Sequence, residues 1–428
     1  MKIPPVKGTR DFYPQDMAVR NWIIDGWKRV SLRNGFEEYD GPIFEYLKMF
    51  QIKSGDEIAE QLFSLKDRGD RELALRPEIT PTLARMVNQR INSLPRPIKW
   101  FSVPRLFRAE RPQKGRLREF FQWNVDIVGE DSVLADAEVI FCALDYLQDV
   151  GLTPDDIVVK LSSRKLLAAV LKKFGIAEER LDSLYLVLDK KSKLPPATFE
   201  QMLAEEVSDR ETAAKIQAFM KTKEVSGIKK VAGPDDEVEK AIVELQELIG
   251  YLERMGVGKY CEFDPAIVRG LAYYTGIVYE IYDRASELRA IGGGGRYDDL
   301  LKQFGGPAVP ATGFGIGDCV LGILLEEKEL LKPKKAELDY FVAVADKTFE
   351  EQVYSITAKL RLKGCSANFS YKPSGLSKQL KEASEQNAKK CIIIGEEFKA
   401  GNIVVKDMST GKQETIPVKD FIENPKKF

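Results

Sequence analysis

Residues 269–282, RGLAYYTGIVYEIY, are the stretch from which the fold is deduced. The second half of this stretch alternates like a strand with two distinct faces. One face holds Ile277, Tyr279 and Ile281, and the other holds Val278, Glu280 and Tyr282. Arg269 lies where a loop enters the strand, close to two tyrosines, which predicts a pocket for an anion beside a flat or cationic group. The alternative is a buried strand whose arginine forms a structural ion pair.

Residues 101–129, FSVPRLFRAERPQKGRLREFFQWNVDIVG, form the strongest electrostatic feature. Within residues 105–118 there are six basic residues and one acidic residue. We expect an antiparallel hairpin with Arg108 and Glu110 on one strand and Gln122 on the other. A run of charges is usually a solvated surface. Here the interleaved phenylalanines and tryptophan favour a pocket wall that binds a phosphate-rich ligand with a flat base.

Residues 73–86, LALRPEITPTLARM, indicate a strand followed by a helix that starts at Thr80 or the next proline. Glu78 and Thr80 therefore fall at a strand-to-helix junction, where side chains face clefts. The structural alternative for Thr80 is capping of the helix N-terminus. Residues 35–50, GFEEYDGPIFEYLKMF, indicate one short strand that is broken at its Gly-Pro pair.

Two glycine-rich segments allow a ligand to approach the backbone closely. Residues 292–295 are four consecutive glycines. Gly313, Gly315 and Gly317 precede a helical run whose backbone amides suit phosphate. Neither segment fits the dinucleotide-binding pattern or the P-loop pattern.

The chain contains no histidine, which excludes histidine-based triads and HExxH metal sites. Its five cysteines form no CxxC pair, so the sequence favours neither a disulfide framework nor a thiolate zinc site. The net charge of −1 indicates no general attraction to nucleic acid. No apolar run is long enough for a membrane span or a signal peptide. We therefore expect a cytoplasmic protein that does not enter membranes.

The 428 residues divide by pattern into two parts and a linker. We expect a large body over residues 1–330, with an inserted helical module at about 176–255. The LKPKK segment, residues 331–335, has the composition of a linker. Strands and helices alternate over residues 336–428, which predicts a small α/β domain with a parallel-type sheet. This end domain is mildly basic, so it suits a polyanionic partner.

Together these segments resemble histidyl-tRNA synthetase, a class II aminoacyl-tRNA synthetase family, over nearly the whole chain. GFEEYDGPIFE resembles motif 1, FRAERPQKGRLREFFQ resembles motif 2, and LRPEITP resembles the LRPEGT segment of the family. RGLAYYTG and GGGGRYD resemble the two histidine-specific signatures. GEEFKAGNIVVKDMSTGKQ is similar to the end of the anticodon-binding domain.

The resemblance implies an α+β fold of the class II synthetase type. A mixed antiparallel catalytic sheet would carry a helical insertion and be followed by an α/β anticodon-binding domain. It also implies a homodimer joined through motif 1. The implied reaction activates histidine with ATP and Mg²⁺ to histidyl-adenylate and then transfers the histidyl group to tRNA(His).

The resemblance assigns roles by motif position. Arg108 and Arg269 match the catalytic arginines, with Arg108 holding the α-phosphate and Arg269 stabilising charge at phosphorus. The implied ATP-binding residues are Arg108, Glu110, Arg116, Gly315 and Gly317. The implied histidine-binding residues are Glu78, Thr80, Gln122, Asp126, Arg269, Tyr273, Tyr274 and Tyr297. No metal ligand is assigned.

Chemistry of this kind is consistent with a chain that lacks histidine. The attacking group is the carboxylate of the substrate, which is already ionised at neutral pH. No general base is required, so catalysis consists of positioning and charge stabilisation. Carboxylates and tyrosine hydroxyls can hydrogen-bond both imidazole nitrogens.

The chain departs from the family pattern in motif 3. The family commonly has Gly-Leu-Glu-Arg, and its arginine grips the γ-phosphate, whereas residues 317–320 are Gly-Asp-Cys-Val. Arg111 or Arg116 would have to replace that arginine, or ATP activation would be impaired; one lost charge-assisted contact costs about 1.5–3 kcal/mol. Glu119 also replaces a common glutamine in motif 2.

Two alternatives follow. The first is a non-catalytic paralogue that binds histidine and regulates histidine biosynthesis, like an ATP phosphoribosyltransferase regulatory subunit. The missing arginine favours it, whereas the intact Arg108 and Arg269 and the end domain oppose it. The second is a plain RNA-binding protein, which leaves the histidine-like pocket unexplained.

Overall fold

The chain divides into two units, Met1–Lys332 and Pro333–Phe428. The computed structural model describes residues 3–51, 62–191, 194–269, 273–285, 287–333, 337–372 and 374–428. Residues 270–272 of the opening stretch and residues 334–335 of the expected linker lie outside the described residues.

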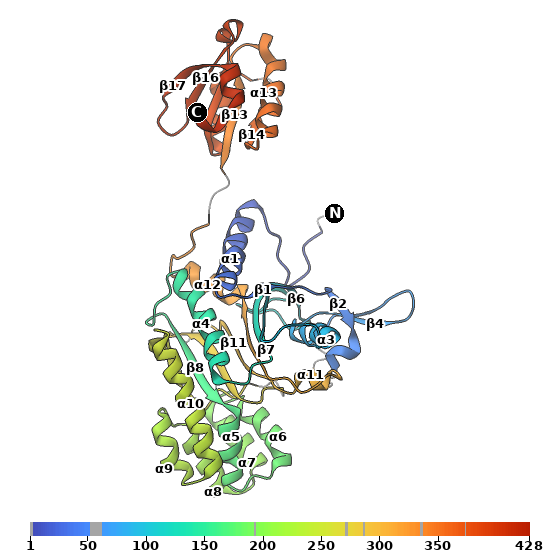
Figure 1. Cartoon of the computed structure of the whole chain (residues 1–428), viewed down its shortest axis with the longest axis vertical. Helices are drawn as coiled ribbons and strands as arrows, with labels where there is room; N and C mark the ends of the chain where they lie inside the picture. Colours follow the sequence, from blue (N-terminus) through green and yellow to red (C-terminus); the bar gives the residue numbers. More distant parts are fainter. Residues whose placement is uncertain are drawn as a thin grey trace. The chain divides into compact units, whose positions relative to one another are not determined.

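The first unit is built on a large mixed sheet (Figure 1). In the described part of the chain it has nine strands in the order β1-β5-β7-β12-β11-β10-β8-β9, with β6 paired to β7. All neighbours from β5 to β8 along this order are antiparallel, whereas β1 and β9 pair in parallel at the two ends. The strands are β1 (Glu37–Glu38), β5 (Ile98–Ser102), β6 (Arg105–Phe107), β7 (Glu119–Val128), β8 (Ile157–Ser163), β9 (Cys261–Phe263), β10 (Ile277–Asp283), β11 (Gly292–Arg296) and β12 (Ala311–Gly317).

The two faces of this sheet have different partners. One face packs on the helices α1 (Pro14–Arg33), α4 (Val133–Asp149), α10 (Asp236–Arg254) and α12 (Asp318–Glu327). Ile277, Tyr279 and Ile281 are buried in that core, and Val278 is buried in a second core on the opposite face. The alternation predicted for β10 is therefore confirmed, because a strand directs successive side chains to opposite faces.

The second face carries α3 (Thr80–Arg90), α11 (Leu300–Gln303) and three tyrosines of the expected site. Beneath it, Arg296 at the end of β11 forms a buried ion pair with Asp136 of α4 at 2.6 Å. Arg296 also donates to the carbonyl oxygen of Ser132 at 2.9 Å. These bonds anchor the chain directly before Tyr297.

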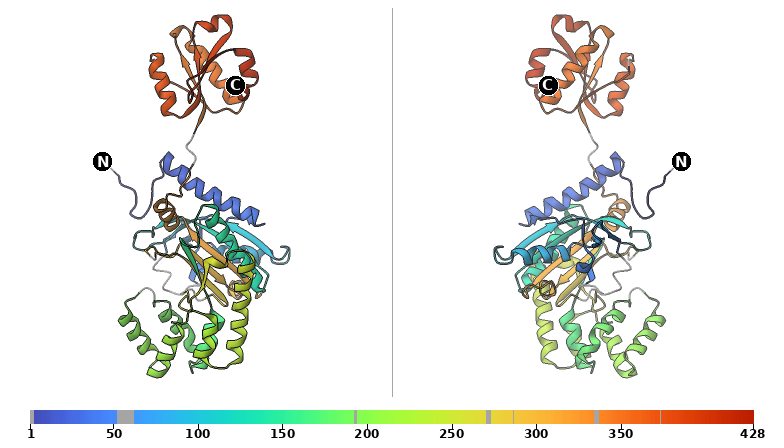
Figure 2. Two further views of the ribbon diagram at one scale, coloured as in Figure 1. Left: turned by 90° about the vertical axis from the view of Figure 1, so that its left-hand side faces the viewer. Right: turned by 90° about the vertical axis from the view of Figure 1, so that its right-hand side faces the viewer.

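Helices fill the sequence between β8 and β9 (Figure 2, green to yellow-green). Their hydrophobic residues belong to the same core as α1 and α4, so this region is not a separately packed body. It contains α5 (Arg164–Lys173), η1 (Glu178–Arg180), α6 (Leu181–Leu188), α7 (Pro196–Glu206), α8 (Arg210–Phe219), η2 (Val225–Gly227), α9 (Ile228–Ala232), α10 and η3 (Gly258–Tyr260).

A small antiparallel sheet precedes α3, with strands β2 (Phe44–Tyr46), β4 (Glu72–Leu75) and β3 (Ser64–Lys66) in that order. The single strand predicted within residues 35–50 is wrong in this respect. This segment forms two strands in different sheets, because β1 pairs with β5 whereas β2 pairs with β4. The buried guanidinium of Arg76 joins the region, since it bonds Asp40 at 2.6 Å between the two strands.

The second unit has a mixed five-stranded sheet in its described residues, ordered β14-β13-β15-β16-β17. The prediction of a parallel-type sheet holds for three strands and is wrong for β16 and β17, which are antiparallel. Parallel pairing requires a long crossover, whereas only a short 3₁₀ turn, η5 (Glu396–Ala400), joins β15 to β16. The remaining elements are β13 (Leu338–Val344), η4 (Lys347–Phe349), α13 (Glu350–Leu362), β14 (Ala367–Phe369), α14 (Leu376–Glu385), β15 (Ala388–Ile394), β16 (Asn402–Asp407), β17 (Gln413–Pro417), α15 (Val418–Glu423) and η6 (Pro425–Lys427).

None of the helices in the described residues has both the length and the apolar character that a membrane crossing requires.

The glycines of β11 allow close strand packing, and this leads to a stability prediction. A Cβ at Gly294 would overlap the carbonyl oxygen of Gly313 on β12. We expect Gly294→Ala to lower the free energy of unfolding by about 1–3 kcal/mol, because the sheet backbone must shift. Gly322→Ala in α12 is the matched control, since no atom lies within 4 Å of its Cβ position. It should stabilise the protein by about 0.5–1 kcal/mol. Urea unfolding checks both, and equal effects would contradict this view of β11.

Candidate active site

Two adjoining cavities lie on the sheet face opposite α4. The smaller has a volume of about 80 Å³ and the larger about 550 Å³. The residues that line both cavities are Glu78, Arg108, Gln122, Arg269, Gly293 and Gly315. A ligand with two parts could therefore occupy both at once.

Arg269 lies in the sequence before β10, which begins at Ile277. Its backbone has φ +58°, and its carbonyl oxygen accepts a hydrogen bond from Arg164 at 3.0 Å. Its guanidinium pairs with Glu280 at 2.9 Å and lines both cavities. Burial alone would lower the pKa of Arg269, but Tyr274 and Glu280 raise it above its usual value. The ion-pair alternative is thus correct as a contact, yet the arginine still faces the cavities.

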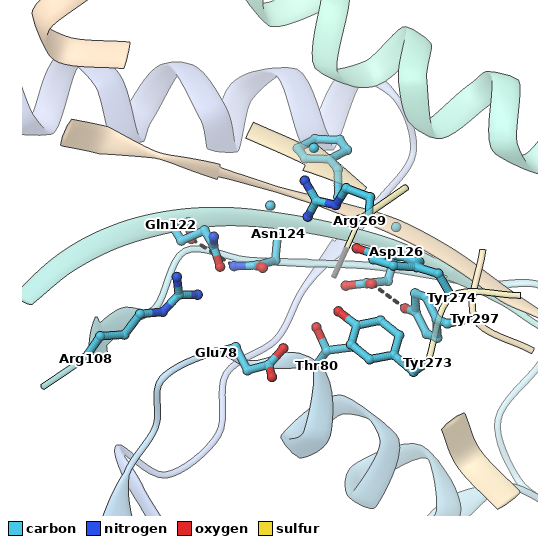
Figure 3. Close-up of a pocket in the computed structure, with 14 residues that line it drawn as sticks. Glu78, Thr80, Arg108, Gln122, Asn124, Asp126, Arg269, Tyr273, Tyr274 and Tyr297 are labelled. Carbon is cyan, nitrogen blue, oxygen red and sulfur yellow. Dashed lines mark hydrogen bonds between the residues drawn. The ribbon is translucent and has the colours of Figure 1, made fainter. Parts of the chain in front are cut away.

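Arg108 reaches the same cavities from the motif 2 segment (Figure 3). The predicted hairpin is confirmed, but β6 ends at Phe107, so Arg108 and Glu110 lie in the loop beyond it. Arg108 Nε donates to the carbonyl oxygen of Pro77 at 3.2 Å, and its guanidinium lies 5.2 Å from the ring centre of Phe120. Burial lowers the pKa of Arg108, and the charge of Arg269 acts in the same direction.

Further arginines make one wall of the larger cavity cationic. Arg116 and Arg289 both line it, and Arg116 forms an ion pair with Glu110. Burial lowers the pKa of Arg116, and the neighbouring charges of Arg289 and Arg108 lower it further. Like charges that oppose one another in a cavity favour binding of a polyanion, which would relieve their repulsion.

The smaller cavity is lined by hydrogen-bonding groups and aromatic rings. Tyr297 donates a hydrogen bond to the buried carboxylate of Asp126. The ring of Tyr273 lies 4.6 Å from that of Tyr274 and 5.9 Å from that of Tyr297, centre to centre. Burial raises the pKa of Tyr297, and Asp126 raises it further, so the phenol stays protonated and can donate. The cavity can thus enclose a small ring that carries polar atoms.

Glycines in β11 and β12 leave room for these side chains. A Cβ at Gly315 would lie 2.8 Å from Gln122, and one at Gly293 would lie 2.5 Å from the guanidinium of Arg269. A Cβ at Gly313 would overlap the carboxylate of Asp126. The glycine pattern therefore has a steric cause, which is separate from phosphate binding.

The structure brings all the residues predicted for the site to the two cavities. The smaller is lined by Glu78, Thr80, Gln122, Asp126, Arg269, Tyr273, Tyr274 and Tyr297. The larger is lined by Arg108, Glu110, Arg116, Gly315 and Gly317. Capping by Thr80 is wrong, because the N-cap of α3 is Ile79 and Thr80 is the first helical residue. The individual roles stay predictions.

Three of the polar lining residues that sequence reasoning missed show why they were missed. Asn124 lies between Gln122 and Asp126 on β7 and shares their face, so the two-residue period of the strand could have identified it. Arg289 lies in the loop between β10 and β11, where no periodic pattern applies. Asp189 follows α6 and brings the helical region to the larger cavity.

An antiparallel sheet with a cationic cavity beside a small polar one is the arrangement that the class II aminoacyl-tRNA synthetase resemblance predicts. The sequence profile of histidyl-tRNA synthetase matches residues 8–317, and that of the anticodon binding domain matches residues 339–427. The chain belongs to the histidyl-tRNA synthetase family.

Relatives in sequence extend over nearly the whole chain. A chloroplastic/mitochondrial histidine–tRNA ligase of Arabidopsis thaliana is 39% identical over 98% of this chain and 86% of its own length. A histidine–tRNA ligase of Opitutus terrae is 38% identical over 96% of this chain and 95% of its own length.

Solved structures agree on the fold. The histidyl-tRNA synthetase of Nostoc sp. PCC 7120 matches with a TM-score of 0.81 and 25% identity, covering 100% of this chain and 99% of that chain. An ATP phosphoribosyltransferase regulatory subunit/histidyl-tRNA synthetase of Bacillus halodurans matches with a TM-score of 0.75 and 22% identity, covering 92% of this chain and 99% of that chain. The second likeness concerns the fold alone.

The cationic wall generates a prediction that does not depend on the reaction. Inorganic pyrophosphate at millimolar concentration should raise the melting temperature, because a ligand that binds only the folded state stabilises it. Arg108→Ala should remove most of that rise. Thermal unfolding with and without pyrophosphate measures both, and an equal rise in the variant would place the anion elsewhere.

Proposed function

We propose that the chain is a histidine–tRNA ligase, which activates histidine with ATP and transfers it to tRNA(His). The observation that carries the proposal is that Arg108 and Arg269 line both cavities, one cationic and one built from tyrosines and carboxylates. The sequence relatives named histidine–tRNA ligase support it. The α-phosphate would lie near the shared wall and the imidazole in the smaller cavity.

In the proposed first step, a carboxylate oxygen of histidine attacks the α-phosphorus, and pyrophosphate leaves. Arg108 and Arg269 would stabilise the negative charge that develops on the phosphoryl oxygens. The ion pair of Arg269 with Glu280 at 2.9 Å would hold its guanidinium in position. Pre-positioned cations need no reorganisation during the reaction, so they lower its barrier.

Histidine would be selected by hydrogen bonds in the smaller cavity. The hydroxyl of Tyr297 donates a hydrogen bond to Asp126 there, and Glu78 also lines that cavity. A site whose buried polar groups pair with the substrate rejects analogues that lack those nitrogens, because the groups would be left unpaired. The proposed selectivity therefore rests on imidazole and not on size alone.

Magnesium forms part of the proposal because ATP is commonly bound with it. The described residues contain no cluster of three metal-ligating side chains. Glu110 and Glu280 line the larger cavity, and each has an arginine partner. These two carboxylates would suit Mg²⁺, because the ion typically takes one or two carboxylates together with phosphate oxygens. The ion would neutralise part of the phosphate charge.

Three broader features belong to the same proposal. The second unit, which matches the anticodon binding domain profile, would contact the anticodon of the tRNA.

A homodimer is supported by the exposed Phe44 and Tyr46 on β2, in the motif 1 region. A native mass of two chains would agree, and a mass of one chain would contradict it. The location would be cytoplasmic, where tRNA serves protein synthesis.

The regulatory alternative remains a second candidate, because the motif 3 arginine is absent. A regulator that binds only histidine has no need for four arginines around a second, larger cavity: Arg108, Arg116, Arg269 and Arg289. We therefore favour the enzyme. Calorimetry separates the two, since histidine binding without any ATP binding would support the regulator.

The proposal predicts that exchange of labelled pyrophosphate into ATP depends on histidine. The exchange reports reversible formation of the adenylate and requires no tRNA. We expect histidine to support the highest rate among the twenty amino acids. Exchange that is equal with and without histidine would rule out the proposed reaction.

Arg269→Ala should reduce the rate of this exchange by about 10²- to 10³-fold, because it removes a charge contact that strengthens in the transition state. Arg164→Lys serves as a comparison, because Arg164 hydrogen-bonds the backbone of Arg269 but lines neither cavity. This variant should reduce the exchange rate less than Arg269→Ala does. Circular dichroism establishes that each variant is folded. An unchanged rate in folded Arg269→Ala would exclude Arg269 from the mechanism.

Tyr297→Phe should raise the KM for histidine about 10-fold or more, because the carboxylate of Asp126 loses its hydrogen-bond donor and the imidazole loses an aligned partner. The KM for ATP should change little, since Tyr297 lines only the smaller cavity. Steady-state exchange at varied histidine and varied ATP measures both. Equal shifts in the two KM values would contradict the assignment of the two cavities.

A further inference from the structure

Arg289 lines the larger cavity and not the smaller one. It lies three residues before β11, in the connection from β10, and its side chain is solvent-exposed. The chain then passes along the cavity wall through Ala290 and Ile291 to the first glycines of β11. Arg289 therefore belongs to the larger cavity alone, whereas Arg269 and Arg108 also line the smaller cavity.

The segment that carries Arg289 is bonded to the start of α12. The backbone N–H of Gly317, the N-cap of α12, donates to the carbonyl oxygen of Ile291 at 3.3 Å. Arg289 is thus held close to residues 317–320, where the family pattern has an arginine and this chain has none. Val320, which occupies that position, lines the same cavity.

Val320 brings no charge to the cavity and packs against the motif 2 loop. Its Cγ2 atom lies only 2.9 Å from the Cβ position of Gly115, so the turn of the motif 2 loop packs directly on it. The positive charge at this end of the cavity must therefore come from lining residues outside α12.

The two arginines expected to compensate differ from Arg289 in their partners. Arg116 is paired with Glu110. Arg111 is exposed and does not line the cavity. Among the described residues, Arg289 has no carboxylate within ion-pair distance. The charge of Arg289 is also strong enough at Arg108 and Arg116 to lower the pKa of each. An exposed guanidinium without a carboxylate partner that lines a cavity together with two other cations can join them in binding an extended anion.

We infer that Arg289 binds the terminal phosphates of ATP and thereby replaces the arginine that α12 lacks. This rests on the proposed function and names a residue for it. In the step concerned, a carboxylate oxygen of histidine forms a bond to the α-phosphorus. The bond from that phosphorus to the bridging oxygen breaks, and its electron pair leaves with pyrophosphate. No proton is transferred. Arg289 contacts the group that leaves, whereas Arg108 and Arg269 contact the phosphorus that is attacked.

The test compares a nucleotide without terminal phosphates with an ATP analogue that carries them. Calorimetry on the full chain measures binding of AMP and of the α,β-methylene analogue of ATP. Arg289→Ala should weaken the ATP analogue about 10- to 100-fold, as expected for loss of one charge-assisted contact, and should weaken AMP less than about two-fold. Arg289→Lys should restore part of the loss, because it retains the charge but not the bidentate geometry.

Two arginines serve as matched controls for the same substitution. Arg111→Ala removes a charge from the motif 2 loop, and Arg284→Ala removes one from the connection that carries Arg289. Neither residue lines the cavity, so neither variant should change the binding of either nucleotide. If Arg289→Ala weakens both nucleotides equally, or neither, the inference is wrong. It is also wrong if Arg111→Ala produces the selective loss, or if the unaltered chain does not bind the ATP analogue.

The same proteins in the pyrophosphate exchange assay separate this inference from the proposed function. If the unaltered chain shows no histidine-dependent exchange, the proposed function fails, whatever the nucleotide binding shows. If it shows exchange and Arg289→Ala leaves the KM for ATP unchanged, only the inference fails. The expected result is exchange by the unaltered chain and a KM for ATP raised about 10-fold or more in the variant, with the KM for histidine unchanged.

Discussion

The site depends on the absence of side chains from one patch of the central sheet. β11 and β12 present glycines toward the cavities, and the volume that Cβ atoms would occupy is taken by the functional side chains of β7 and of the loop before β10. Any residue larger than glycine at position 293 or 315 would meet Arg269 or Gln122. The glycines of β11 and β12 are also fixed in position, since both strands are paired on each side within the antiparallel part of the sheet. Steric room and fixed position are therefore provided by the same residues.

The electrostatics of the site follow from this arrangement. Several arginines line the cavity beside the glycines of β11 and β12. Burial and mutual repulsion lower the pKa of Arg108 and of Arg116. The pKa of Arg269 is instead raised, because Tyr274 and Glu280 outweigh the effect of burial. The protein therefore stores unfavourable charge interactions that an extended anion would relieve. A reaction driven by positioned cations, with an ionised carboxylate as nucleophile, is compatible with a chain that contains no histidine.

Much of this could be predicted from the sequence, and the remainder has physical reasons for being missed. The alternation of β10 spans enough residues to show a period of two, and residues 269–298 carry distinctive signatures. β1 and β2 are two and three residues long, too short for any periodic signal, and the sheet to which each belongs is decided by distant partners. β16 and β17 also required knowledge of how the chain turns after β15. Arg289 lies in an irregular connection, so only its three-dimensional position reveals it. Asn124 is different, because the alternation of β7 already placed it beside Gln122 and Asp126.

The family assignment and the cavity geometry together favour an enzyme over a regulator, despite the substitution in motif 3. The account requires one ligand arrangement, in which a single nucleotide meets both ends of the larger cavity while histidine fills the smaller one. The most direct measurement is a crystal structure of the chain with histidine and a non-hydrolysable ATP analogue. The account predicts the α-phosphate between Arg108 and Arg269, the imidazole beside Asp126 and Tyr297, and the terminal phosphates at Arg289. A nucleotide bound outside this cavity, or Arg108 and Arg269 contacting different ligands, would contradict it.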